Sequence, residues 1–159
     1  MNDLISEHYK TAYDYCLKLL SIREICERDL RKKLKNKSLT KSETDQIIDT
    51  LKDKKYLSDD RYSVCFIKEH TKRKKGVNWI IHALKNKGIT VRPEKIEEIR
   101  QDYALKDGKS LALEILLKKY PDFSHDLKSK SRAYRGLTSR GFSFKEIDFA
   151  FDSAFKVKK

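Results

Sequence analysis

Apolar residues recur along this chain at intervals of three and four, the spacing typical of helices that bury one face. The clearest stripe joins Val77, Ile80, Ile81 and Leu84, at positions i, i+3, i+4 and i+7. No stretch shows the apolar–polar alternation of a half-buried strand. The pattern therefore predicts an all-α protein of about nine helices, with no sheet.

A short sequence recurs three times, each time where one helical pattern ends. It reads LKNKSL at residues 34–39, LKNKGI at residues 84–89 and LTSRGF at residues 137–142. In two copies the small residue is glycine, which takes the left-handed conformation that closes a helix without steric cost. The recurrence predicts one helical unit of about fifty residues, present in three tandem copies.

The predicted units cover residues 1–56, 57–106 and 107–159, each with three helices. Because each unit of a repeat protein contacts mainly its neighbours, an elongated array is expected. Capping boxes are expected at residues 40–43 (TKSE) and 143–146 (SFKE), where a hydroxyl and a Glu satisfy the first free N–H groups of a helix. The inward-facing stripes also assign side chains to the core, among them Cys16, Tyr56, Leu57, Cys65, Tyr103 and Leu127.

Basic residues exceed acidic ones, and the excess is uneven along the chain. The formal net charge is +13, from 37 Lys and Arg against 24 Asp and Glu. Residues 1–60 carry 13 basic and 12 acidic groups, whereas residues 61–106 carry 12 against 5 and residues 107–159 carry 12 against 7. A basic surface confined to part of a small protein favours a polyanionic partner, most often nucleic acid. The alternative is a solubilising surface.

The sharpest basic cluster is the run KRKK at residues 72–75, which ends a predicted helix. Further basic residues lie on the second predicted helix of units two and three and would form a track if the units repeat in space. The candidate partner- or nucleic-acid-binding residues are Lys68, Lys72, Arg73, Lys74, Lys75, Lys85, Lys87, Arg132, Arg135 and Arg140. The alternative is a set of solvated helix ends favoured by the helix dipole. Trp79 and Tyr134 are candidates for stacking on bases, although packing between helices is the more ordinary use of an aromatic ring.

Several functional classes find no support in the residues. No Cys/His or Ser/His arrangement and no phosphate-cradling glycine-rich loop is apparent, so neither an enzyme nor a cofactor is expected. Three cysteines without close pairing do not suggest a disulfide framework, and the histidines form no i, i+4 pair for a metal. With no signal peptide or membrane-spanning run, the chain is expected to be cytoplasmic. A monomer is expected because the inward stripes account for most apolar residues.

Several segments between about residues 9 and 155 form a recognisable series. They are residues 19–24 (LLSIRE), 29–34 (DLRKKL), 56–62 (YLSDDRY), Gly76 followed by Ile80, residues 84–89 (LKNKGI) and Gly141-Phe142-Ser143 with Ile147. In their order and spacing these segments resemble the RecX family of bacterial regulators. The chain departs from the family pattern at Ser38, where glycine is common, and at Lys75, where an aromatic residue often precedes Gly76.

The resemblance implies three three-helix units and a protein that lies in the groove of the RecA recombinase filament on single-stranded DNA. There it would inhibit ATP hydrolysis, strand exchange and co-protease activity. The alternative from the residues alone is a helical nucleic-acid-binding protein that needs no recombinase and reads duplex sequence through a helix-turn-helix unit. Asn78, near the start of a helix, is the one candidate for base reading.

Overall fold

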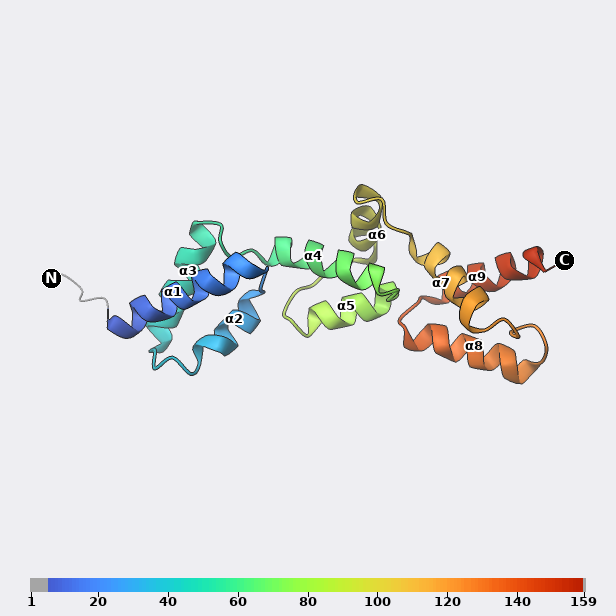
Figure 1. The fold of residues 1–159 in the computed structure, drawn as a ribbon, viewed down its shortest axis with the longest axis horizontal. Coiled ribbons are helices and arrows are strands. Elements are labelled where there is room, and N and C mark those ends of the chain that lie inside the picture. The colour runs from blue at the N-terminus through green and yellow to red at the C-terminus, as the bar shows by residue number, and fades with distance from the viewer. Residues whose placement is uncertain (1–5, 159) are drawn as a thin grey trace. The chain divides into compact units, whose positions relative to one another are not determined.

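The computed structural model describes residues 6–158, which contain nine α-helices and no strand (Figure 1). The prediction of an all-α fold is confirmed. The helices are α1 (Glu7–Ile22), α2 (Glu27–Leu34), α3 (Lys41–Asp53), α4 (Asp59–Lys72), α5 (Val77–Lys85), α6 (Pro93–Asp102), α7 (Gly108–Lys119), α8 (Leu127–Ser139) and α9 (Phe144–Val157). No helix in this range is long and apolar enough to cross a membrane.

Contacts divide the chain into two compact units, one ending at Cys65 and the other beginning at Phe66. The first unit has a core formed by α1, α2 and α3, with Cys16, Leu30, Ile47 and Leu51 fully buried. The division into three repeated units stays a prediction, because the second compact unit contains most of two of them.

The second unit is built around helices that lie far apart in the sequence. Figure 1 shows α7 and α9 side by side, and α8 closes the same apolar cluster, with Phe123, Leu137 and Ala154 fully buried. Residues Ile80, Leu84 and Ile96 of α5 and α6 are also fully buried. The stripe that the sequence showed on α5 is therefore the buried face of that helix.

The helix ends follow the recurring sequence. Ser38, Gly88 and Gly141 have φ values of 55°, 80° and 85°, so the small residue is left-handed in all three copies, serine included. The ten residues 31–40 and the ten residues 81–90 also share the same order of buried, half-buried and exposed positions. Both predicted capping boxes are present, on α3 and α9.

Four of the six core positions named above are wrong, and Phe155 and Leu117, also expected on inward stripes, are 38% and 36% exposed. Cys65 is exposed, and the exposed fractions of Tyr56, Tyr103 and Leu127 are 50%, 49% and 83%. Tyr56 and Tyr103 follow the last turns of α3 and α6, where the chain leaves the helical path and the apolar stripe no longer applies. Leu57, at 3% exposed, fills the core position beside Tyr56. Leu127 opens α8 ahead of the first buried residue of that helix, Ala133.

Candidate nucleic-acid interface

Basic side chains from three parts of the second unit line one hollow of about 270 Å³. The residues that line it, called the basic hollow below, are Lys72, Arg73, Lys74, Ile115, Lys118, Lys119 and Arg140. Four of them were candidate binding residues from the sequence. Lys118 and Lys119, in the last turn of α7, were not among the candidates.

The first side of the basic hollow is the end of α4, whose backbone is fixed by hydrogen bonds. Lys74 is left-handed, with φ 58°, and the Lys75 N–H donates to the carbonyl oxygen of His70 at 2.9 Å. The side chain of Arg100 donates to the carbonyl oxygen of Lys75 and to Oγ1 of Thr71, both at 3.1 Å. Arg100 is 1% exposed, so this support is built into the interior.

The opposite side is the turn between α8 and α9, which lies against the turn between α4 and α5. The Gly76 N–H donates to the carbonyl oxygen of Arg140 at 2.8 Å, and the Asn78 N–H donates to that of Gly141 at 2.9 Å. A Cβ on Gly76 would come within 2.2 Å of the Gly141 carbonyl carbon, so this approach requires glycine. This contact brings Arg140 to the basic run although 65 residues of sequence separate Arg140 from Lys75.

Two carboxylates are paired with part of the basic hollow. Glu114 on α7 accepts hydrogen bonds from Lys106 at 2.6 Å, Lys74 at 2.7 Å and Lys118 at 3.1 Å. These hydrogen bonds, with that from Lys106 the largest influence, hold the pKa of Glu114 far below its usual range. Arg73 pairs with Glu69 at 2.6 Å. Among residues 6–158, Lys72, Lys119 and Arg140 form no ion pair and are left available to an external anion.

The other candidate residues lie outside the basic hollow. The ammonium groups of Lys68 and Lys75 lie over the rings of Tyr103 and Trp79, at 3.8 and 4.6 Å from the ring centroids. Arg132 pairs with Asp122 at 2.5 Å. The remaining three are Lys85 and Lys87 at the end of α5 and Arg135 on α8. A continuous track through all ten residues therefore stays a prediction.

The two aromatic candidates are packed within the protein. The Trp79 ring lies 6.3 Å from the ring of Phe66 and 4.7 Å from that of His70, and Tyr134 stacks 6.4 Å from Phe151. Burial lowers the pKa of His70, with the charges of Arg73 and Lys75 acting in the same direction and that of Glu69 opposing them. Both rings already have partners, which favours a packing role over base stacking.

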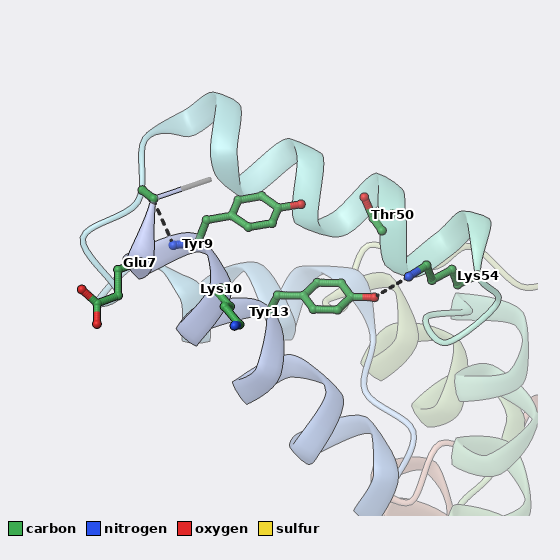
Figure 2. A pocket seen from close by; sticks show the side chains of 7 residues that line it. Glu7, Tyr9, Lys10, Tyr13, Thr50 and Lys54 are labelled. Atoms are coloured by element: carbon green, nitrogen blue, oxygen red, sulfur yellow. Dashed lines mark hydrogen bonds between the residues drawn. The ribbon is translucent and has the colours of Figure 1, made fainter. Parts of the chain in front are cut away.

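A larger hollow, of about 810 Å³, lies on the first unit between α1 and α3 (Figure 2). The rings of Tyr9 and Tyr13 form much of its wall, and Lys54 donates a hydrogen bond to the Tyr13 hydroxyl at 3.3 Å. None of the ten candidate residues lines it. In the part of the chain described, no group of three His, Cys, Asp or Glu side chains is placed to hold a metal.

Comparison with known proteins decides the family. No family model matches the chain. Regulatory protein RecX of Mannheimia succiniciproducens is 34% identical over 142 residues, which cover 87% of this chain and 90% of that protein. The chain belongs to the RecX family. RecX of Actinobacillus pleuropneumoniae serotype 5b is 34% identical over 134 residues, and that of Haemophilus influenzae strain PittEE is 28% identical over 139.

Solved RecX structures share the fold. A crystal structure of regulatory protein RecX superposes with a TM-score of 0.76 at 23% identity, covering 92% of this chain and 72% of that one. RecX from Lactobacillus salivarius gives 0.77 at 21% identity, covering 93% and 97%. The relatives are named as regulatory proteins, and the chain is a RecX-type regulator and not an enzyme.

Proposed function

We propose that this protein binds the RecA recombinase filament on single-stranded DNA and mainly inhibits its ATPase, strand-exchange and co-protease activities. Its role is then regulatory, in homologous recombination, DNA repair and the SOS response. We propose that it acts as a monomer, in the cytoplasm, where the recombinase and its DNA lie.

Membership of the RecX family is the observation that carries this proposal, since 34% identity extends over 142 residues. The basic hollow supports it, because a regulator in the groove of a nucleoprotein filament meets phosphate groups and protein together. All six of its cationic residues lie in the second unit, which begins at Phe66. This location agrees with the uneven charge along the sequence.

Direct reading of duplex DNA by α5 finds less support. In a helix-turn-helix protein, residues at the start of the recognition helix contact base edges. Here two N–H groups at the start of α5, those of Gly76 and Asn78, are bonded to carbonyl oxygens of the turn after α8. The turn after α8 therefore packs against the backbone at the start of α5, which leaves the exposed Asn78 side chain as the one base-reading candidate there.

The proposal is tested by binding, with the protein labelled at Cys65. This cysteine is exposed, whereas Cys16 and Cys26 are buried, and burial raises the pKa of both, that of Cys16 to about 11. A maleimide dye therefore reacts selectively at Cys65. Fluorescence anisotropy then compares recombinase filaments on single-stranded DNA with the bare strand and with a duplex of the same sequence.

The proposal expects the tightest binding to the filament and the weakest to the duplex. Equal affinity for the filament and the bare strand would contradict it and leave direct nucleic-acid binding as the function. A Cys65→Ser variant labelled under the same conditions serves as the control for dye attachment at the buried cysteines.

A further inference from the structure

We propose that the basic hollow is a binding pocket for a single phosphate group of a single-stranded nucleic-acid backbone, held mainly by Lys119 and Arg140 with Lys72 beside them. This inference rests on the proposed function and names the chemical group that the site takes. It also adds Lys119, which the sequence did not suggest, to the binding residues.

The charge of the basic hollow is the first argument. Six cationic side chains line it, and two carboxylates, Glu69 and Glu114, pair with some of them, which leaves four positive charges in excess. Cations gathered on a protein surface repel one another and lower the stability of the compact state. A bound anion relieves that repulsion, so the arrangement favours an anionic ligand.

The second argument is that two of the cations, and the backbone that carries Arg140 and the end of α4, are held in place before any ligand arrives. Glu114 fixes Lys74 and Lys118, Arg100 fixes the end of α4 through the Lys75 carbonyl oxygen, and the Gly76 N–H fixes the backbone of Arg140. A preformed site loses less conformational entropy on binding than flexible surface lysines would. The basic hollow thus receives cations from α4, from α7 and from the turn after α8.

Size and polarity select the ligand. The volume of about 270 Å³ is several times the roughly 30 Å³ of a water molecule in the liquid, enough for one phosphate group with some water. Ile115, which lines the hollow, is 2% exposed and provides no polar partner for a base. Lys and Arg bind phosphate oxygens by charge and, for Arg, by two parallel hydrogen bonds.

The test uses a Lys119→Gln/Arg140→Gln variant with Lys128→Gln/Lys156→Gln as its matched control. All four side chains belong to the second unit, and the control pair is exposed and does not line the basic hollow. The Gly76 N–H bonds to the backbone of Arg140, so the exchange at Arg140 leaves that hydrogen bond in place. Binding of the protein alone to an oligothymidylate is measured against salt concentration.

On a single strand, each phosphate contact contributes roughly −0.7 to the log–log slope of affinity against salt. If both residues hold one phosphate group, the double variant loses about 0.7 of slope, whereas two separate contacts would lose about 1.4. In parallel, inorganic pyrophosphate is expected to raise the thermal unfolding midpoint of the wild type at constant ionic strength, by mass action on the folded state. The double variant is expected to lose this shift and the control to keep it.

Three results would each overturn the proposed phosphate pocket. They are an unchanged salt slope in the double variant, a loss of about 1.4 in that slope, and an equal pyrophosphate-induced shift of the unfolding midpoint in wild type and variant. A wild-type slope near zero, with filament binding lost in the variant, would assign the hollow to acidic groups of the recombinase instead and would also overturn it. Failure of the proposed function would give a different result. In that case the pocket would still bind phosphate, but the wild-type protein would not change the activity of the recombinase.

Discussion

The guanidinium of Arg100 donates a hydrogen bond to the backbone carbonyl oxygen of Lys75, at 3.1 Å. Arg100 lies on α6 and is almost fully buried, whereas Lys75 follows the end of α4. The bond joins an interior cation to the backbone of the basic run. Arg100 also binds Thr71 and Glu97, so one side chain holds the end of α4 against α6.

Replacing Arg100 by methionine keeps much of the side-chain volume but removes these hydrogen bonds. The Lys75 carbonyl and the Thr71 hydroxyl lose their partner in the interior. The free energy of unfolding is expected to fall by about 3 kcal/mol, as measured by urea denaturation. Arg92→Met, at an exposed position just before α6, is the control and should change stability by no more than about 0.5 kcal/mol. An equal, small effect of both exchanges would refute the supporting role of Arg100.

Gly141 is expected to tolerate no side chain. Its φ is 85°, and a Cβ would lie 2.3 Å from the Cβ and the backbone nitrogen of Trp79. Gly141→Ala should lower the free energy of unfolding by about 3 kcal/mol, from backbone strain and overpacking together. Gly88→Ala, at an exposed position with φ 80°, isolates the backbone contribution and should cost about 1 kcal/mol. Chemical denaturation measures the loss in the free energy of unfolding of each variant. Equal losses would contradict the prediction, because they would mean that the contact between residue 141 and Trp79 adds no cost.

Ser38 offers the opposite test. It holds a left-handed conformation that glycine adopts without strain, with φ 55°. Ser38→Gly is expected to raise the thermal midpoint, with a gain of up to about 1 kcal/mol. Ser42→Gly, in the first turn of α3, should instead lower it, because glycine weakens a helix by about 0.5 kcal/mol or more. A destabilised Ser38→Gly variant would show that the serine side chain is needed there.

The pH dependence of stability reports on His70. Its folded-state pKa lies below the ordinary value of 6.5, chiefly because of burial. The unfolded chain therefore binds a proton more readily, and stability falls as pH drops below 6.5 towards the folded pKa. His70→Phe should weaken this dependence in denaturation curves between pH 7 and pH 5, whereas the exposed His125→Phe should leave it intact. An unaltered pH profile in His70→Phe would contradict this explanation.

The sequence predicted the helices and their ends well, because helix caps and apolar stripes depend on residues that are close together in the chain. Thr40 with Glu43 and Ser143 with Glu146 form capping boxes within four residues, and the stripe on α5 follows from helical spacing alone. The positive φ of Gly88 and Gly141 follows from the same local logic. Lys55, Lys74 and Ala104 also have positive φ values. None of them is a glycine, so the sequence did not indicate their left-handed conformation.

The site depended on contacts that sequence spacing does not reveal. Arg140 joins the basic run because Gly76 approaches the backbone of residues 140 and 141, and Lys119 reaches the same hollow from α7. Arg100, which is buried, was not singled out from the sequence. One signal was present: Gly76 directly follows the basic run, and a glycine there permits the close approach.

The most direct measurement is single-stranded-DNA-dependent ATP hydrolysis by the RecA recombinase, titrated with this protein and with a Lys72→Glu/Arg140→Glu variant. Lys128→Glu/Lys156→Glu controls for the change in net charge. We expect the wild type and the control to inhibit hydrolysis well below the concentration that coats free DNA, and the variant to need a much higher concentration. Undiminished hydrolysis with the wild type, at concentrations where it binds bare DNA, would contradict a filament regulator.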